Sequence, residues 1–166
     1  MKKNEHLIPI LYEYLDNIDI NDSFFDSLKK DYYHFEEWYE RKSMKKEKAY
    51  ITYNSFNELG SFLLLKIENK NEDYSNFKKS FSKGKRLKIC TFKVKNNGYG
   101  IGGKYFKIIL EEAKKNKVNE IYITLYKKQT NLMELLMKYN FILYTTKLTK
   151  KLDLSIEEEL VFVKKV

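Results

Sequence analysis

Residues 87–104 read Leu-Lys-Ile-Cys-Thr-Phe-Lys-Val-Lys-Asn-Asn-Gly-Tyr-Gly-Ile-Gly-Gly-Lys, and this stretch decides the fold. Its first part is rich in apolar and β-branched side chains, which predicts a strand over Leu87–Val94. Four of the chain's six glycines follow, at positions 98, 100, 102 and 103. Beyond them, apolar residues recur at helical spacing to about Lys115, namely Ile101, Tyr105, Ile108, Ile109 and Ala113. The stretch therefore predicts a strand, a glycine loop and a helix in succession.

A glycine loop between a strand and a helix suits an anionic ligand. The first N–H groups of a helix have no partners within it, and the helix dipole adds positive potential there. Glycine adopts positive φ easily and lets a phosphate approach the backbone closely. Lys104 stands in the first helical turn, where a cation opposes the dipole unless it faces phosphate. The alternative is a glycine-rich turn in an inactive or repurposed domain.

Three phosphate-binding motifs compete for this loop. The P-loop requires Ser or Thr after its lysine, but Tyr105 follows Lys104. The dinucleotide fingerprint G-x-G-x-x-G fits the glycine spacing, and Glu120 lies at a suitable distance. That fingerprint belongs to the first βαβ unit of a parallel sheet, however, whereas a predicted hairpin precedes the loop here. The third motif is Q/R-x-x-G-x-G/A.

The segments before the loop predict helices and a hairpin. Lys3–Asp16 fits either a strand or a helix. The N-cap residues of Asn21–Lys30 and the aromatic spacing of His34–Lys42 predict two helices. Lys48–Tyr53 and Ser61–Glu68 predict the two strands of a hairpin, and the polar segment 69–85 predicts an irregular loop.

The segments after the glycine-loop helix predict the rest of a sheet. Glu120–Tyr126 is nearly all apolar, as expected for a strand buried on both faces. Leu132, Leu135, Leu136 and Tyr139 indicate a short helix, and Phe141–Thr149 and Glu159–Val166 indicate closing strands. From Lys48 the order is β-β-β-α-β-α-β-β. We therefore expect one α/β domain over residues 1–166, built on a mostly antiparallel sheet.

Composition argues against several classes of protein. The one cysteine, Cys90, allows no intramolecular disulfide, and the two histidines lie far apart, so we expect no metal. No apolar run reaches the roughly 18 to 20 residues of a membrane span, and the N-terminus does not resemble a signal peptide. We expect a soluble, cytoplasmic protein with no membrane partner.

The net charge of +9 is unevenly distributed. Residues 1–40 carry four basic and ten acidic residues, a net of −6, and the remainder carries 28 and 13, a net of +15. The scattered lysines, with abundant Asn, Ile and Tyr, are typical of an AT-rich genome. We interpret the basic excess as compositional bias plus a basic cofactor face. Nucleic acid as a partner stays open but is not favoured.

The third motif belongs to the Gcn5-related N-acetyltransferases (GNAT), and the sequence resembles this family. Asn97-Gly98-Tyr99-Gly100-Ile101-Gly102 matches the family's acyl-CoA loop, with Asn97 where Gln or Arg is usual. The similarity spans about residues 60–145. It includes Asn131 near the start of the next helix and Tyr139-Asn140-Phe141 where the family often has x-Gly-Phe. The resemblance implies the GNAT acyl-CoA N-acyltransferase fold, with a mixed sheet flanked by helices and strands that splay at the cofactor site.

The resemblance also implies a reaction and a cosubstrate. An acetyl group would pass from acetyl-CoA to a primary amine by direct attack on the thioester. Pantetheine would pair with the main chain of Phe92 and Val94 like an added strand, and Asn131 would contact its arm. The pyrophosphate would lie in the loop, on Asn97, Gly98, Gly100, Ile101, Gly102, Gly103 and Lys104.

The catalytic residues are less well indicated. The family's usual thiolate-protonating tyrosine corresponds to Leu136, which cannot donate a proton, so Tyr139 and Tyr126 are the candidates. In this fold the first helices border the acceptor, and Glu36, Glu37 and Glu40 could attract a cationic amine. Leu136 also motivates an alternative, a catalytically weak acyl-CoA-binding module, and the basic excess motivates an RNA- or ribosome-associated acetyltransferase. The acceptor, whether a small molecule, a peptide or an aminoacyl-tRNA, is left open, as is a homodimer.

Overall fold

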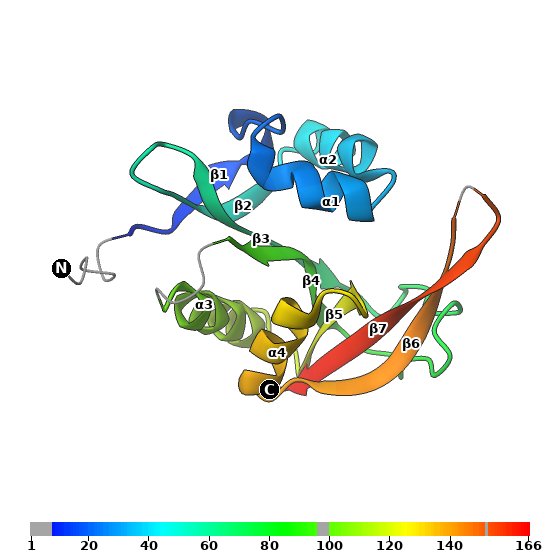
Figure 1. The fold of residues 1–166 in the computed structure, drawn as a ribbon. Coiled ribbons are helices and arrows are strands. Elements are labelled where there is room, and N and C mark those ends of the chain that lie inside the picture. Colours follow the sequence, from blue (N-terminus) through cyan, green and yellow to red (C-terminus); the bar gives the residue numbers. More distant parts are fainter. Residues whose placement is uncertain (1–7, 96–99, 152) are drawn as a thin grey trace. The chain divides into compact units, whose positions relative to one another are not determined.

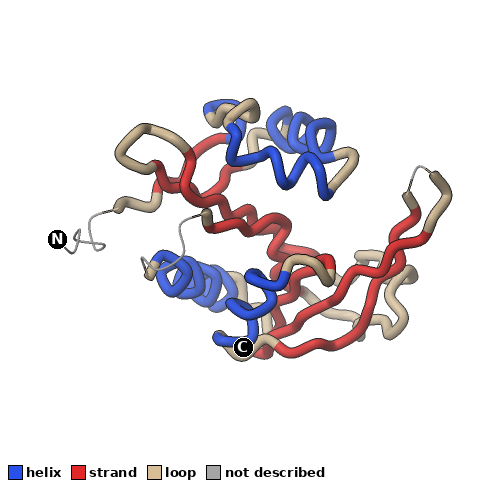
Figure 2. Tube along the Cα trace, viewed as in Figure 1, coloured by secondary structure: helices blue, strands red, loops and turns tan. Residues whose placement is uncertain are grey.

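The computed structural model describes residues 8–95, 100–151 and 153–166 of the 166-residue chain, so residues 96–99 of the glycine loop lie outside the described part. Figure 1 labels the elements and Figure 2 colours them by type. The described strands are β1 (Leu11–Tyr14), β2 (Lys48–Tyr53), β3 (Leu59–Glu68), β4 (Arg86–Val94), β5 (Glu120–Tyr126), β6 (Ile142–Lys150) and β7 (Ile156–Lys165). The described helices are η2 (Leu15–Asn17) and η3 (Ser23–Phe25), both 3-10, and α1 (Asp26–Asp31), α2 (Phe35–Met44), α3 (Ile101–Lys115) and α4 (Thr130–Lys138).

The strands have the order β1-β2-β3-β4-β5-β7-β6. The pairs β1–β2, β2–β3, β5–β7 and β6–β7 are antiparallel, and β4–β5 is parallel, with Leu87–Ile89 opposite Ile121–Ile123. The predicted mixed, mostly antiparallel sheet and the predicted order of elements from Lys48 are therefore confirmed.

Most predicted elements agree with the structure to within a few residues. The bounds of β2 and β5 are those predicted, and α3 extends from Ile101 to Lys115. The ambiguous Lys3–Asp16 contains the strand β1. The helix predicted from Asn21 begins later, because the Asp22 carboxylate accepts the Phe24 N–H at 2.8 Å and caps a 3-10 turn, and α1 follows from Asp26.

By the contacts among its residues, the chain divides into two compact units. Unit 1 comprises residues 1–64 and 91–101, and unit 2 comprises residues 65–90 and 102–166. The strands β3 and β4 and the helix α3 contribute residues to both units. The single domain expected over residues 1–166 stays a prediction.

The core of unit 1 is an aromatic cluster centred on Phe25. The Phe25 ring lies 5.3 to 5.9 Å, between centroids, from the rings of Phe24, Phe35, Tyr39 and Phe62. Burying each such side chain stabilises the fold by roughly 1.5–3 kcal/mol. Figure 1 shows α1 and α2 side by side. The aromatic spacing that predicted α2 therefore marks its buried face.

The core of unit 2 includes the loop 69–85, coloured tan in Figure 2. Its rings Tyr74, Phe77 and Phe81 pack on Tyr122 and on β7. The main chain of this loop also pairs with β6, where the Lys78 N–H donates to the Thr146 carbonyl at 2.9 Å. The segment is irregular, as predicted, but it is packed as part of the core. Among the described residues, no helix is long and apolar enough to cross a membrane.

Candidate functional site

The glycine turn before α3 depends on one backbone angle. Gly100 has φ 65°, and it is the one described glycine in the left-handed region. A Cβ at Gly100 would meet no atom within 4 Å, so the backbone conformation, and not crowding, favours glycine there. Ile101, the first residue of α3, is buried and anchors the start of the helix. The predicted ligands Asn97 and Gly98 lie outside the described residues.

Glycine is favoured at positions 102 and 103 for a different reason, because α4 approaches α3 closely there. A Cβ at Gly102 would lie 3.1 Å from Leu135 Cδ1, and one at Gly103 would lie 2.9 Å from Tyr139 Oη. Contacts that short require the neighbour to move. The glycine-rich pattern thus combines a turn at Gly100 with helix packing at Gly102 and Gly103. Phosphate binding by the latter two stays a prediction.

Tyr139 is held with its hydroxyl against the first turn of α3. It follows the last residue of α4, and its ring stacks on Phe106 with centroids 4.1 Å apart and planes at 18°. The Lys164 ammonium donates to the Tyr139 carbonyl at 3.0 Å and fixes the main chain. Sequence reasoning missed Phe106 and Leu135 as neighbours of the site. The adjacent glycines on one helix were the signal that another element comes close.

The other predicted residues near α4 have different settings. Leu136 is fully buried and is part of the apolar core. Tyr126 ends β5 and is 7% exposed, and its N–H donates to Gln129 Oε1 at 2.8 Å. Asn131 is exposed in the first turn of α4, where its amide can meet a ligand from solvent. Lys104 is half-buried in the first turn of α3.

The end of β4 contains one residue that the sequence did not single out. The two residues predicted to bind pantetheine differ in exposure: Phe92 is buried and Val94 is half-buried. Between them, Lys93 donates from Nζ to the Phe24 carbonyl at 2.5 Å and to Ser27 Oγ at 2.8 Å. Burial, and then the charge of Lys95, lower the pKa of Lys93. A single lysine in a strand gives no sequence signal for such contacts.

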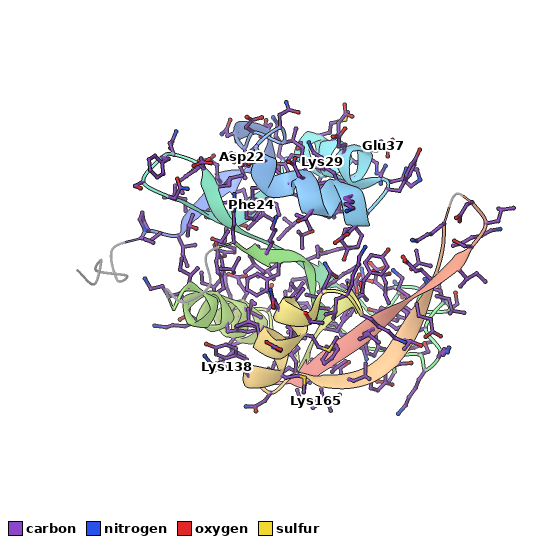
Figure 3. The ribbon with its side chains drawn as sticks, in the orientation of Figure 1. Asp22, Phe24, Lys29, Glu37, Lys138 and Lys165 are labelled. Atoms are coloured by element: carbon purple, nitrogen blue, oxygen red, sulfur yellow. The ribbon has the colours of Figure 1, made fainter. Side chains whose placement is uncertain are left out.

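The acidic residues of α2 are exposed and partly paired. Lys29 Nζ lies 3.2 Å from Glu36 Oε1, and His34 Nδ1 lies 2.8 Å from Glu37 Oε2, while Glu40 is exposed. Figure 3 labels Lys29 on α1 and Glu37 on α2. Attraction of a cationic amine by these carboxylates stays a prediction. Within residues 8–95, 100–151 and 153–166, no three His, Cys, Asp or Glu side chains group to hold a metal ion.

A small cavity lies beside Tyr139 in unit 2. Its volume is about 220 Å³, and its lining is mainly apolar, with Phe106, Ile109, Leu110, Ile121, Lys138, Tyr139, Asn140, Phe141 and Lys164. Pockets for drug-sized ligands have volumes of about 300–1,000 Å³. The cavity is therefore too small to hold a nucleotide cofactor.

The sequence matches no protein-family model and no curated protein. Solved structures nevertheless share its fold. NAA60 from Arabidopsis thaliana, in complex with a bisubstrate analogue, superposes with a TM-score of 0.63 at 15% identity, covering 95% of this chain and 99% of that one. An IAA acetyltransferase from Bacillus cereus ATCC 14579 has a TM-score of 0.60 at 12% identity, covering 95% and 100%.

A third similar structure contains a cosubstrate. A GNAT family acetyltransferase from Elizabethkingia anophelis, with acetyl-CoA bound, has a TM-score of 0.54 at 14% identity, covering 99% of this chain and 100% of that one. At these identities the likeness is one of fold.

Proposed function

We propose that this chain, which has the GNAT fold, transfers an acetyl group from acetyl-CoA to an amine-bearing acceptor. The observation that carries the proposal is Gly100 at φ 65° directly before the N-terminus of α3, after strand β4. The N-terminus of a helix offers an anion main-chain N–H groups that have no partner within the helix, together with the positive end of the helix dipole. Two similar structures, of NAA60 and of the Elizabethkingia protein, contain acetyl-CoA.

In this proposal the cosubstrate is bound mainly by main-chain groups. Amides of the glycine loop hold the diphosphate, and the loop residues concerned are Asn97, Gly98, Gly100, Ile101, Gly102, Gly103 and Lys104. The main chain of Phe92 and Val94 pairs with pantetheine, and the exposed Asn131 amide contacts its arm. Binding by main-chain groups depends little on side-chain identity, because every residue except proline has a backbone N–H group.

The chemistry requires a neutral amine and a proton for the leaving thiolate. The amine nitrogen attacks the thioester carbonyl and forms the C–N bond, the C–S bond breaks, the nitrogen loses one proton to solvent, and the thiolate sulfur takes up one proton from the donor. Tyr139 is the first candidate donor, and stacking on Phe106 fixes its ring. Tyr126 is the second candidate, and it is almost entirely buried.

Two assays test the function in sequence. Acetyl-CoA should raise the melting temperature of the pure protein, because a ligand that binds only the folded state stabilises it. A thiol-release assay should then detect free CoA with at least one amine from a panel of polyamines, lysine peptides and peptides with a free N-terminus. A melting temperature unchanged at millimolar acetyl-CoA would contradict the proposal.

A catalytically weak acyl-CoA-binding module is the second candidate, favoured by one observation. Leu136 stands where the resembling family has its usual proton donor, and it is fully buried in the core. Stabilisation by acetyl-CoA without thiol release across the whole amine panel would favour this module over the enzyme.

A further inference from the structure

Lys93 connects strand β4 to the segment of unit 1 formed by η3 and α1. Side chains alternate along a strand, so Lys93 extends to the face opposite Phe92 and Val94. Its ammonium donates to the Phe24 carbonyl at 2.5 Å and to Ser27 Oγ at 2.8 Å, and it lies 4.5 Å from the Phe24 ring centroid. Phe24 is fully buried. Figure 3 labels Phe24 and Asp22 on this segment.

The same segment is also fixed to the neighbouring strand. The Asp22 carboxylate accepts the Phe24 N–H at 2.8 Å and the Leu59 N–H at 3.2 Å, where β3 begins. The Lys95 N–H, just after β4, donates to the Gly60 carbonyl at 2.8 Å. The contacts of Asp22, Lys93 and Lys95 therefore fix the end of β4 to η3 and α1 and to the start of β3.

The position of the Lys93 ammonium has a free-energy cost. A partly buried ammonium loses hydration, and the charge of Lys95 adds repulsion, which the carboxylates of Asp26, Asp31 and Asp22 only partly offset. An apolar side chain would avoid that cost. A costly residue at the position between Phe92 and Val94 is explained if the conformation that it imposes is needed.

We propose that Lys93 is a positioning residue that holds the end of β4 in the conformation whose main chain binds pantetheine. The inference rests on the proposed function. It requires the main-chain groups of Phe92 and Val94 to be presented to the cosubstrate in one fixed register. Lys93 provides this by anchoring the residue between them on the opposite face.

The test compares three variants in the full chain. Lys93→Met keeps the aliphatic stem and removes the ammonium, and Lys93→Arg keeps a cationic donor. Lys88→Met is the matched control, because Lys88 is half-buried on the same strand and, among the described residues, its side chain makes no hydrogen bond or ion pair. The measurements are the melting temperature, the CoA dissociation constant by titration calorimetry, and kcat and KM for acetyl-CoA.

We expect Lys93→Met to change the melting temperature little, because the desolvation cost that it removes offsets the two hydrogen bonds that it loses. Its CoA dissociation constant and its KM for acetyl-CoA should each rise about tenfold, which corresponds to the loss of one or two hydrogen bonds to the cosubstrate. The kcat should change by less than about twofold. Lys93→Arg should recover part of the affinity, and Lys88→Met should match the wild type.

Unchanged CoA affinity in Lys93→Met would overturn the inference. So would a loss of affinity that parallels a loss of folded protein. A wild-type protein that binds no CoA would instead overturn the proposed function, so the two failures are distinguishable.

Discussion

Tyr139 illustrates how a side chain gains a role from its surroundings. Its ring is fixed on Phe106, and its hydroxyl lies at the first turn of α3, next to Gly103. The sequence predicted the residue as a candidate proton donor but could not predict this setting, because Phe106 lies more than 30 residues away along the chain.

Replacing the phenol tests the donor role. We expect Tyr139→Phe to keep the ring stack and to lower kcat by about 100-fold, the lower end of what general acid–base catalysis contributes. CoA affinity should stay at the wild-type value. Tyr126→Phe removes the phenol of the second candidate donor, and we expect it to keep kcat within about threefold. A fall in kcat for Tyr126→Phe alone would contradict the assignment.

The extent of sequence-based prediction is clear at single residues. The glycine at position 100 was predicted correctly as a turn residue, because left-handed φ is a local property. The reason for glycine at positions 102 and 103 was not predictable, because it depends on where α4 packs against α3. Nor was Lys93, because its partners Phe24 and Ser27 are more than 60 residues distant in sequence.

At the scale of elements, α3 lies close to α4 at Gly103, and a methyl group at this position would prevent so close an approach. We expect Gly103→Ala to lower the free energy of unfolding by about 1–3 kcal/mol, because its Cβ would lie 2.9 Å from Tyr139 Oη. In the Tyr139→Phe background the nearest ring atom is 4.0 Å away, so the same change should cost little.

A double-mutant cycle measures this coupling by urea unfolding of the wild type, both single variants and the double variant. Additive free energies would show that the helices do not approach each other in this way.

Strands β4 and β5 are joined at their beginning by a buried ion pair. Arg86 Nε donates to Glu120 Oε1 at 2.8 Å, and Lys165 also pairs with Glu120. Burial alone would raise the pKa of Glu120, but the hydrogen bonds from Lys165 and Arg86 more than offset it, and the pKa is lowered from 4.5. A lowered carboxyl pKa contributes stability that is complete above the unfolded value and is lost as the pH falls below it.

We therefore expect wild-type stability to fall, in part through Glu120, as the pH falls below about 4.5. Glu120→Gln should be less stable at pH 7, by about 3–5 kcal/mol, because it leaves Arg86 buried without its charged partner. Its further loss on acidification should be smaller than that of the wild type. Urea unfolding at pH 7 and at a pH below about 4.5 checks this. If acidification lowered the free energy of unfolding equally in the two proteins, the ion pair would be excluded as a cause.

Elements were predictable where periodicity is strong. The apolar run of β5 and the helical spacing of α3 gave correct bounds, because burial imposes those patterns directly. The packing of the loop 69–85 was not predicted. Its aromatic residues have no regular spacing, and they become core only because β5 and β7 lie beneath them.

At the scale of the whole molecule, charge differs between the two units. Unit 1 has 11 basic and 12 acidic residues, and unit 2 has 21 and 11, which gives −1 and +10 and the total of +9. Several lysines of unit 2 are paired, for example Lys78 with Glu158 and Lys151 with Glu157, the latter at 2.7 Å. Such pairs reduce the positive potential available to a polyanion.

We accordingly expect weak RNA binding that disappears at physiological salt. Retention on an RNA column should be lost by about 0.15 M salt, because the lysines are scattered along the chain, so that few of them would contact phosphates at once and few counterions would be released. Retention above that concentration, with a steep dependence on salt, would support the RNA-associated alternative.

The central claim is that the turn at Gly100 and the N-terminus of α3 bind the diphosphate of coenzyme A. Titration calorimetry of CoA into the wild type, Gly100→Ala and Gly84→Ala tests it most directly. A Cβ at Gly84 would make only an ordinary contact, 4.0 Å from Arg86, whereas alanine at φ 65° costs about 1–2 kcal/mol. We expect micromolar binding by the wild type and Gly84→Ala, and at least about tenfold weaker binding by Gly100→Ala. No heat of binding at millimolar CoA, or equal affinity in all three proteins, would contradict it.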